Sequence, residues 1–447
     1  MKKKITVIGC GYVGLVTGIG LSELGYEVIC TDKNPEKIKK LQAGMIPFFE
    51  PGLNQLRTRN ILEGRLSFSK DIKESLKKAD IVIIAVGTPP LKTGETDLSQ
   101  INSAVQSIIE SISHYQLIIM KSTVPPGTNH MLSQFVKSQV NVDFDWISNP
   151  EFLREGRAVQ DFFAPDRIVI GYETENGKSA ISNLYKTYNW LHTPFLYTDF
   201  VSAEVIKYAS NSFLGVKISF INQMAQLSEK LGSDMDMIKL GIGLDPRISP
   251  HFLNPGPGFG GSCLPKDMNS LIAMSEKLGI PLTLIKEAQT SNENHKMHIV
   301  DLVENAVDDL EDKNIGVLGL TFKANTDDIR ESPAIKIIQE LLFRQANIKV
   351  YDPEGMSNFF LKHPRWNISY CQNPQDVFTE TDLILILTEW DIFKELDYIK
   401  LKPFMRGRLI VDTRNILDKN LLSNWGYKVL SLGYSSTLEK VGLTQFE

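Results

Sequence analysis

The sequence predicts an α/β protein with two Rossmann-like α/β domains joined by a long central helix and a helical middle domain. Three observations lead to this prediction. Short apolar runs alternate with helical patterns over residues 1–200, the alternation returns over residues 306–447, and residues 201–305 have a helical pattern. Such alternation is typical of parallel sheets covered on both faces. A chain of 447 residues is long enough for two or three domains.

Each part of the chain carries its own local signals. The first contains the strand-like runs "KITVIGC", "YEVICTD" and "ADIVIIAVGTPP", and the third contains "NIGVLGLTF", "NIKVYDP", "DLILILTEW" and "RLIVDTRN". From Ser202 to Leu231 there is no proline, and apolar residues recur at helical spacing up to a stop near Gly232. A helix of this length spans about 45 Å. It is long enough to connect two domains and to offer a dimerisation face.

Composition limits the classes of function. The net charge of −5 argues against a general nucleic-acid or membrane surface. No stretch reaches the roughly 18 apolar residues of a membrane span, and glycines interrupt the apolar run at the start of the chain. Four cysteines do not suggest a disulfide framework and fit a reducing compartment. We therefore expect a cytoplasmic protein.

A glycine motif follows the first predicted strand. "GCGYVG" places Gly9, Gly11 and Gly14 in the G-x-G-x-x-G pattern, and Asp32 ends the next strand. In this context the glycines allow a tight turn, a close approach to a pyrophosphate and close helix–strand packing. Asp32 can accept hydrogen bonds from ribose hydroxyls and would repel a 2′-phosphate, which favours NAD over NADP. The alternative is a glycine-rich turn without a ligand.

Three pairs of chemically active residues stand four positions apart: Glu151 and Glu155, Lys207 and Asn211, and Cys263 and Asp267. If each segment is helical, both members of a pair project from one face. The structural alternatives are solvated helix faces for the glutamates and a surface lysine at position 207.

Cys263 stands after the glycine-rich stretch "NPGPGFGGS". Ser262 is a suitable N-cap and Pro265 suits a first helical turn, so we expect Cys263 at the start of a helix. There the helix dipole and Lys266 would lower the pKa of the thiol and favour the thiolate. From this segment alone, a loop cysteine without a chemical role is an equal alternative.

Six motifs occur in an order that identifies a family: "GCGYVG", "KSTVPPGT", "SNPEFLREG", "AEVIKYASNSFL", "LDPRISPHFLNPGPGFGGSCLPKD" and "FKANTDDIRESP". The sequence resembles the UDP-glucose/GDP-mannose dehydrogenase family over nearly its whole length, and most closely the UDP-glucose 6-dehydrogenase branch. The resemblance implies oxidation of UDP-glucose to UDP-glucuronate with two NAD in succession. It implies a Cys263 thiohemiacetal and thioester between the two hydride transfers.

The resemblance also implies roles for individual residues. The catalytic residues would be Cys263, Lys207, Asn211, Asp267, Glu151 and Thr123. The NAD-binding residues would be Gly9, Gly11, Tyr12, Val13, Gly14, Asp32, Lys37, Thr88, Ser122, Thr123, Glu155, Lys266 and Arg330. The substrate-binding residues would be Glu151, Phe152, Leu153, Glu155, Lys207, Asn211, Arg247, Phe252, Asn254, Gly260, Lys323 and Arg414. No metal is expected.

The expected partners are a UDP-sugar and a second copy of the chain, docked through the central helix with Arg247 reaching into the neighbour's site. Residues 306–447 would bind the nucleotide part of the substrate. A GDP-mannose 6-dehydrogenase and a UDP-N-acetylhexosamine dehydrogenase remain alternatives, since Leu264 after the cysteine also occurs in the mannose branch. From other classes, a two-electron hydroxyacid dehydrogenase and a non-catalytic NAD-binding scaffold remain open.

Overall fold

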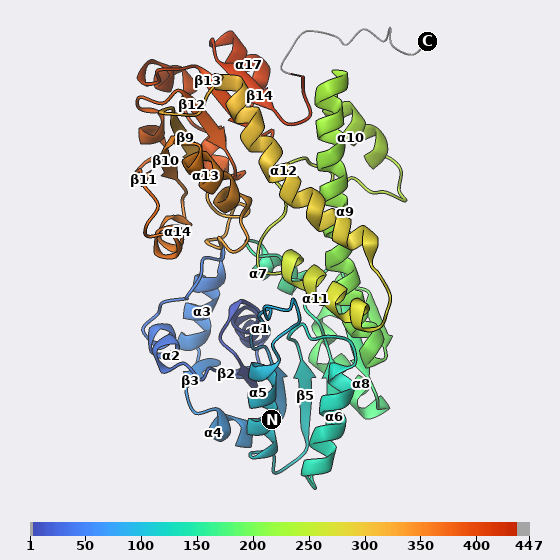
Figure 1. Cartoon of the computed structure of the whole chain (residues 1–447). Helices are drawn as coiled ribbons and strands as arrows, with labels where there is room; N and C mark the ends of the chain where they lie inside the picture. Colours follow the sequence, from blue (N-terminus) through green and yellow to red (C-terminus); the bar gives the residue numbers. More distant parts are fainter. Residues whose placement is uncertain (1–2, 436–447) are drawn as a thin grey trace. The chain divides into compact units, whose positions relative to one another are not determined.

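The computed structural model describes residues 3–435, apart from the side chains of residues 189–191. The chain divides into two compact units (Figure 1). Unit 1 comprises Met1–Ser210 and Asn269–Ile280, and unit 2 comprises Asn211–Met268 and Pro281–Glu447. The long helix α9 (Phe200–Leu231) begins in unit 1 and ends in unit 2. The predicted helix over 202–231 is therefore present, with two more residues at its start.

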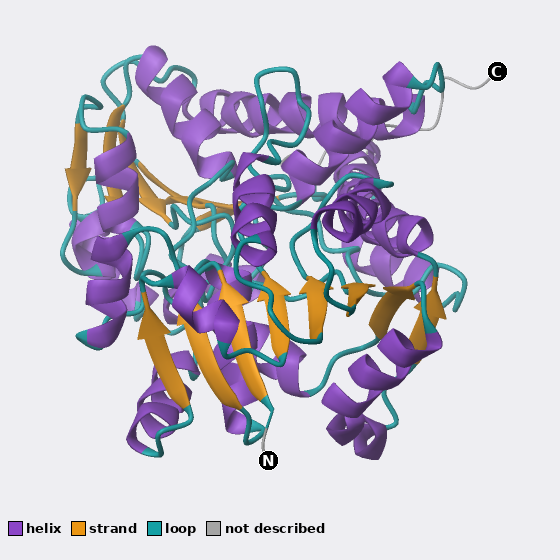
Figure 2. Cartoon of the chain, turned by 90° about the horizontal axis from the view of Figure 1, so that it is seen from below, coloured by secondary structure: helices purple, strands orange, loops and turns teal. Residues whose placement is uncertain are grey.

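Unit 1 is built on an eight-stranded sheet in the order β3-β2-β1-β4-β5-β6-β7-β8. Its strands are β1 (Lys4–Ile8), β2 (Glu27–Thr31), β3 (Leu66–Ser69), β4 (Ile81–Ile84), β5 (Gln116–Met120), β6 (Phe144–Ser148), β7 (Ile168–Tyr172) and β8 (Phe195–Thr198). The first six have the strand order of a Rossmann fold. Figure 2 shows the strands side by side as orange arrows.

One strand pair departs from the predicted parallel arrangement. Strands β6 and β7 are antiparallel, with Ile147 opposite Tyr172 and Ser148 opposite Gly171. The reason is the path of residues 149–167. This connection does not carry the chain back to the start of β6, so β7 begins beyond the carboxyl end of β6 and runs back alongside it.

Helices cover both faces of this sheet because neighbouring strand residues point to opposite sides. Ile83 packs in a core with α1, α3 and α7, whereas Ile84 packs in a second core with α4, α5 and α6. The helices of unit 1 before α9 are α1 (Tyr12–Glu23), α2 (Pro35–Gln42), α3 (Leu53–Leu62), α4 (Ile72–Lys77), α5 (Ser99–Ile109), α6 (Thr128–Gln139), α7 (Ala158–Phe163), α8 (Glu175–Leu184) and η1 (Lys186–Leu191).

Unit 2 contains a second Rossmann-type sheet, all parallel, in the order β11-β10-β9-β12-β13-β14. Its strands are β9 (Asn314–Leu318), β10 (Asn347–Tyr351), β11 (Ile368–Tyr370), β12 (Leu383–Ile386), β13 (Leu409–Asp412) and β14 (Lys428–Ser431). Four of these strands, β9, β10, β12 and β13, were predicted from the apolar runs of the sequence. One face of the sheet packs with α12, α13 and α14, and the other packs with η2, α15, α16 and α17.

The remaining helices complete the described chain. They are α10 (Met235–Gly243), α11 (Leu264–Lys277), α12 (Thr283–Val307), α13 (Pro333–Phe343), α14 (Met356–Lys362), η2 (Pro374–Phe378), α15 (Asp391–Lys394), α16 (Tyr398–Leu401), η3 (Lys402–Phe404) and α17 (Lys419–Asn424). Within residues 3–435, no helix combines the length and apolar character that crossing a bilayer requires. The α/β fold class predicted from the sequence is confirmed, with two Rossmann-type sheets and a helical middle part.

The two sheets begin with the same local construction. Gly9 after β1 and Gly319 after β9 both have positive φ, +104° and +102°. Gly9 N donates to Thr31 O at 2.7 Å, and Gly319 N donates to Tyr351 O at 2.8 Å. An aspartate follows each accepting strand, Asp32 in unit 1 and Asp352 in unit 2. The first strand and turn of each unit are thus built alike, although α1 begins at Tyr12, close to Gly9, and α13 begins only at Pro333.

Candidate active site

The glycine motif forms an open cradle at the start of α1. A Cβ at Gly9 would overlap the carbonyl of Ala85, and a Cβ at Gly14 would overlap the carbonyl of Gly9. A Cβ at Gly11 would meet nothing within 4 Å. Gly11 is also the N-cap of α1, and no side chain caps this helix. The uncapped N–H groups and the open space above Gly11 fit the pyrophosphate of a dinucleotide.

Asp32 follows β2 and is held as a carboxylate. It accepts hydrogen bonds from Cys10 N at 3.0 Å, Asn34 N at 3.0 Å and Lys37 Nζ at 2.8 Å. Burial by itself would raise the pKa of Asp32, but the bonds from Lys37 and the two main-chain N–H groups outweigh it and lower the pKa. A carboxylate at this position suits the ribose hydroxyls of NAD.

Glu151 and Lys207 form a buried ion pair in unit 1. Lys207 Nζ donates to Glu151 Oε1 at 3.1 Å, and the side chains are 4% and 6% exposed. Glu151 Oε2 accepts from Leu153 N at 2.6 Å. The ring of Phe152 lies 3.8 Å from Arg167 Cζ and 5.2 Å from Lys207 Nζ. The loop after β6 and helix α9 together fix this carboxylate.

The expectation that Glu151 and Glu155 share a helical face is wrong. Residues 151–154 have no regular secondary structure, and the next helix starts only at Ala158. Carboxylate side chains accept hydrogen bonds from the main-chain N–H groups of this loop. Glu151 accepts from Leu153, Asp161 accepts from Arg154 at 2.9 Å, and Glu50 accepts from Gly156 at 2.7 Å. Such bonds compete directly with helix formation.

Cys263 lies at the start of a helix in unit 2, as predicted. Helix α11 begins at Leu264, and Asp267 N donates to Cys263 O at 2.9 Å. The first helical carbonyl thus belongs to Cys263, so Cys263, rather than Ser262, has the cap position. The Ser262 hydroxyl lies 3.5 Å from Cys263 Sγ.

Asp267 is the centre of a buried polar group beside Cys263. It is 1% exposed and accepts from Asn211 Nδ2 at 2.6 Å and from Lys266 Nζ at 2.5 Å. Asn211 lies one turn after Lys207 on α9, so these two side chains leave the helix on the same face. Lys266, which we expected to lower the pKa of the Cys263 thiol, therefore forms an ion pair with Asp267.

Helix α12 holds the glycine-rich approach to Cys263, which the sequence reasoning missed. Asn292 accepts from Phe259 N at 2.8 Å and donates to Phe259 O at 3.1 Å. His295 Nε2 lies 2.8 Å from Gly256 O, and burial lowers the pKa of His295 to about 4. The ring is therefore neutral and donates to this carbonyl. The spacing of Asn292 and His295 on one helical face was the available signal.

Arg414 and Lys323, the residues of unit 2 predicted to bind the nucleotide, both lie near Phe322. Arg414 donates from Nε to Leu387 O at 2.8 Å and from Nη2 to Phe322 O at 2.9 Å, and its guanidinium lies beside Gly256. Lys323 Nζ lies 5.4 Å from the Phe322 ring. Thus Arg414, Lys323 and the glycine-rich approach are brought together.

The other predicted residues have varied surroundings, and Arg330 meets the glycine-rich approach through its main chain, where Gly261 N donates to Arg330 O at 2.9 Å. Arg247 is 87% exposed at its side chain and pairs with Asp245 at 2.6 Å, and Arg330 pairs with Asp328 at 2.6 Å. Phe252 and Asn254 are exposed, whereas Gly260 is buried against the carbonyl of Glu331. In unit 1, Thr88 and Ser122 are buried near the carboxyl ends of β4 and β5, with Thr123 and Lys121 beside Ser122.

A dinucleotide cradle on a Rossmann sheet, with a second Rossmann-type unit that carries a cysteine at a helix start, defines a nucleotide-dependent dehydrogenase. Three family models match in order: the UDP-glucose/GDP-mannose dehydrogenase family NAD binding domain over residues 3–189, the central domain over 201–294, and the UDP binding domain over 316–419. The chain belongs to this family and is an NAD-dependent nucleotide-sugar dehydrogenase.

Individual relatives agree over almost the full length. The chain is 40% identical to the UDP-glucose 6-dehydrogenase of Rhizobium meliloti (strain 1021) over 435 residues, which are 96% of this chain and 99% of the relative. It matches a UDP-glucose dehydrogenase structure from the hyperthermophilic archaeon Pyrobaculum islandicum with TM-score 0.89 and 37% identity, covering 97% and 98% of the two chains. A UDP-D-ManNAc dehydrogenase from Pyrococcus horikoshii matches with TM-score 0.84 and 27% identity, covering 97% and 100%.

Two glycine substitutions should separate cofactor binding from folding. In Gly11→Ala the added methyl meets no protein atom within 4 Å, so it blocks the ligand alone. We expect NAD affinity to fall roughly tenfold or more with unchanged melting temperature. In Gly14→Ala the methyl overlaps the Gly9 carbonyl, which costs about 1–3 kcal/mol of stability. Isothermal titration and thermal melts measure both effects, and unchanged NAD affinity in Gly11→Ala would contradict the cradle.

Proposed function

We propose that the protein oxidises UDP-glucose to UDP-glucuronate in a four-electron reaction through a thioester on Cys263. One observation carries the proposal: a cysteine at the start of a helix, approached by a glycine-rich loop, in a chain that also has a complete dinucleotide cradle. A two-electron dehydrogenase needs no such nucleophile. Named UDP-glucose 6-dehydrogenases at about 40% identity support glucose as the sugar.

We also propose that the protein is cytoplasmic, because its four free cysteines suit a reducing compartment.

The chemistry explains why a thiol is needed between two oxidations. NAD, when bound, supplies the acceptor for each hydride. The C6 alcohol first becomes an aldehyde, and the Cys263 thiolate adds to it to form a thiohemiacetal. Loss of a second hydride gives a thioester. Water then attacks the thioester carbonyl, the C–S bond breaks, and the acid leaves with the thiol restored.

Four polar residues have proposed roles in these steps. Lys207 and Asn211 would donate to the oxygen that becomes an oxyanion, since both leave α9 on one face. Glu151 would act as the general base that takes a proton from the attacking water, with Thr123 helping to hold that water. Asp267, held by Asn211 and Lys266, would keep the asparagine amide turned toward its substrate oxygen.

Residues 306–447 would bind the nucleotide part of the substrate. Arg414 donates to two main-chain carbonyls and pairs through Nε with Glu389 at 3.1 Å. Its Nη1, beside Gly256 in the glycine-rich approach, would be the nitrogen that meets a phosphate. Lys323 on the neighbouring loop adds a second positive charge. A domain division at about residues 200 and 305 follows from this proposal, with NAD held by residues 1–200.

The count of NADH tests the reaction and its substrate together. We expect two NADH per UDP-glucose consumed, and at least tenfold lower kcat/KM with GDP-mannose, UDP-N-acetylglucosamine and UDP-galactose, about 1.4 kcal/mol of discrimination. Absorbance at the NADH band with chromatography of the sugar product measures both. One NADH with free aldehyde, or preference for another sugar, would contradict the proposal.

Replacing Cys263 should stop the second oxidation. In Cys263→Ser the hydroxyl has a far higher pKa than a thiol, so the acid-forming rate should fall on the order of 10³-fold or more. NAD affinity should stay within about twofold, because the cradle of unit 1 is untouched. Cys371→Ser, at a cysteine outside the proposed site, is the control. Full acid formation in the Cys263 variant would remove the nucleophile role.

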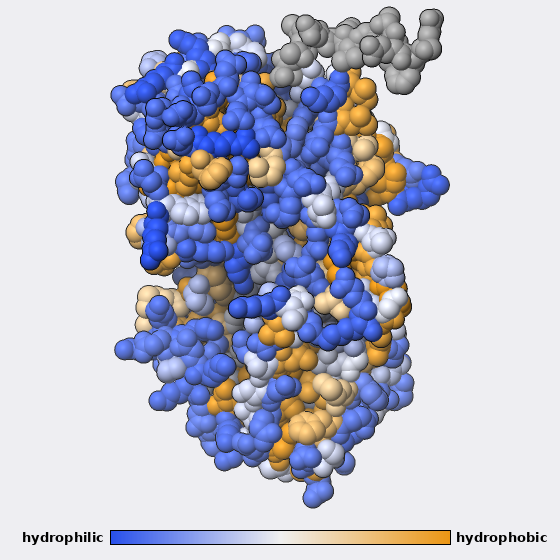
Figure 3. All heavy atoms as spheres, viewed as in Figure 1, coloured by the Kyte–Doolittle hydropathy of each residue, from blue (hydrophilic) through white to orange (hydrophobic). Residues whose placement is uncertain are grey.

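We also propose that the chain forms a homodimer through α9 and α10. Phe213, Phe220 and Leu227 repeat every seven residues along α9 and are 64%, 47% and 50% exposed. On α10, Met237 and Leu240 are 61% and 52% exposed. Figure 3 shows hydrophobic residues gathered over these helices. A seven-residue repeat of exposed apolar side chains is the pattern of a helix that packs against another helix.

Charges on this face should separate the subunits. We expect the double substitution Phe213→Glu with Phe220→Glu to give a monomer at protein concentrations where the natural chain is a dimer, because both glutamates would be buried unpaired. Light scattering after size-exclusion chromatography measures the mass. Phe343→Glu, which changes a side chain that is 80% exposed on α13, serves as control. A natural chain that is monomeric, or a variant that stays dimeric, would contradict the interface.

A further inference from the structure

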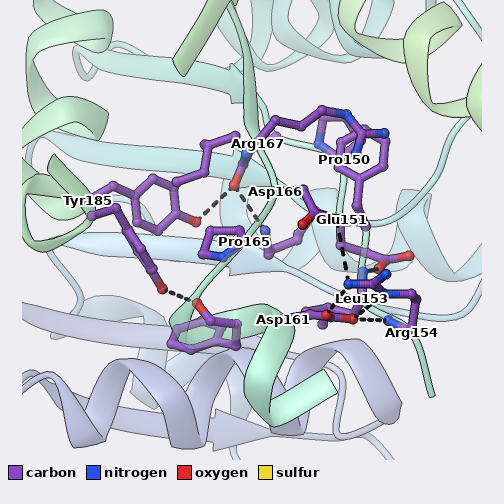
Figure 4. A pocket seen from close by; sticks show the side chains of 15 residues that line it. Pro150, Glu151, Leu153, Arg154, Asp161, Pro165, Asp166, Arg167 and Tyr185 are labelled. Carbon is purple, nitrogen blue, oxygen red and sulfur yellow. Dashed lines mark hydrogen bonds and ion pairs between the residues drawn. The ribbon is translucent and has the colours of Figure 1, made fainter. Parts of the chain in front are cut away.

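A cavity of about 60 Å³ with a mixed charged and apolar lining lies beside Glu151 in unit 1 (Figure 4). Its wall includes Glu151, Leu153, Arg154 and Arg167, which Figure 4 labels. Lys121 also lines it. A volume of this size holds roughly four water molecules, and the charged groups of the wall offer hydrogen-bond partners to them. Apolar side chains such as Leu153 and Phe162 complete the wall.

Lys121 is the most unusual member of this wall. It is 8% exposed, and Nζ donates to Asn149 Oδ1 at 3.0 Å. The same oxygen accepts from Tyr185 Oη at 2.8 Å, and Asn149 Nδ2 donates to Val169 O at 2.8 Å. Within residues 3–435, Lys121 forms no ion pair with a carboxylate. A buried ammonium with one neutral acceptor needs further acceptors, and water in the cavity provides them.

Glu151 faces two buried lysines. Lys207 donates to Oε1 and Leu153 N donates to Oε2, so each oxygen retains a free lone pair. Burial lowers the pKa of Lys121 to about 8, the charge of Glu151 acts in the opposite sense, and Lys207 adds to the lowering. At neutral pH Lys121 is therefore protonated, so its ammonium shares the wall of the cavity with the Glu151 side chain.

We propose that this cavity stores the water for thioester hydrolysis and that Lys121 is a positioning residue, whose ammonium orders that water beside Glu151. The inference rests on the proposed function, because it assigns a role within the hydrolytic step. In that step Glu151 takes one proton from water, the oxygen bonds to the thioester carbon, and the C–S bond breaks. The proton then passes to the departing Cys263 thiolate, so the atoms and charges balance.

Lys121→Met tests the role, because methionine has similar length and no charge. Enzyme with excess NAD is mixed with less than one equivalent of UDP-glucose, NADH is followed by absorbance, and the acyl-enzyme is followed by intact mass after acid quench. We expect NADH formation within about threefold of the natural rate, but decay of the acyl-enzyme about ten- to a hundredfold slower. Lys121→Arg, which restores the charge, should recover most of the decay rate.

Two controls remove a purely structural explanation. Lys296→Met removes another buried lysine, which donates to Glu293 at 2.6 Å on α12, and should leave acyl-enzyme decay unchanged. Lys121→Met should melt no lower than the natural protein at pH 7. The depressed pKa means that burial of the ammonium opposes folding below about pH 8, and this penalty fades as the pH rises from there toward the ordinary value for lysine.

The possible results are distinct. Normal acyl-enzyme decay in Lys121→Met, or NADH formation slowed as much as the decay, would overturn the role of Lys121. Failure of Lys121→Arg to recover the decay would overturn the charge argument. If the natural enzyme forms neither NADH nor an acyl-enzyme from UDP-glucose, the proposed function itself fails, and this outcome is recognised before any variant is compared.

Discussion

The chemistry of unit 1 depends on one constraint: parallel strands end at the same edge of their sheet. Strands β1, β2, β4, β5 and β6 are mutually parallel, so the residues that follow them gather at one edge. These residues are Gly9, Asp32, Thr88, Lys121, Ser122 and Glu151. Ladder hydrogen bonds and the two cores fix the strands, and the polar residues take their positions from them. The edge is the usual ligand site of an open α/β sheet.

The charges at this edge do not serve stability. Removing a carboxylate and an ammonium from water costs several kcal/mol per ion, and apolar side chains of similar volume often give equal stability. Unit 1 nonetheless buries Glu151, Lys207 and Lys121 in one region. The Glu151–Lys207 pair recovers part of the cost through its 3.1 Å contact, whereas among residues 3–435 Lys121 donates to the neutral side chain of Asn149 and to no carboxylate. Charges kept at such a cost are expected where a reaction needs them.

Sequence reasoning succeeds where local pattern and final structure agree. Helix α9 has no proline and a regular apolar spacing, so the prediction that Lys207 and Asn211 leave it on one face needed no tertiary information. The prediction failed for Glu151 and Glu155, because their loop is held by Glu50 and Asp161, carboxylates from other segments that bind its N–H groups. The prediction of an all-parallel sheet failed at β7 because the path of residues 149–167, which sequence patterns do not reveal, sets its direction. Lys121 had a weak signal, a charge directly after the apolar run "LIIM", but its burial and its hydrogen bond to Asn149 are visible only in the folded chain.

The two Rossmann units show how one construction yields two different sites. In unit 1, Asp32 accepts three hydrogen bonds, from Cys10, Asn34 and Lys37, which leaves acceptor capacity for a ribose hydroxyl. In unit 2, Asp352 accepts from the main chain of Leu320, Thr321, Glu354 and Gly355 and from the side chains of Thr321 and Trp390. A carboxylate offers about four acceptor positions, so Asp352 has none left for a ribose. Under the proposed function, unit 2 would therefore hold a nucleotide by other groups, for which we propose Arg414 and Lys323. The two units thus share the turn after their first strand but differ in the acceptor positions that the following aspartate leaves open, which fits NAD binding by unit 1.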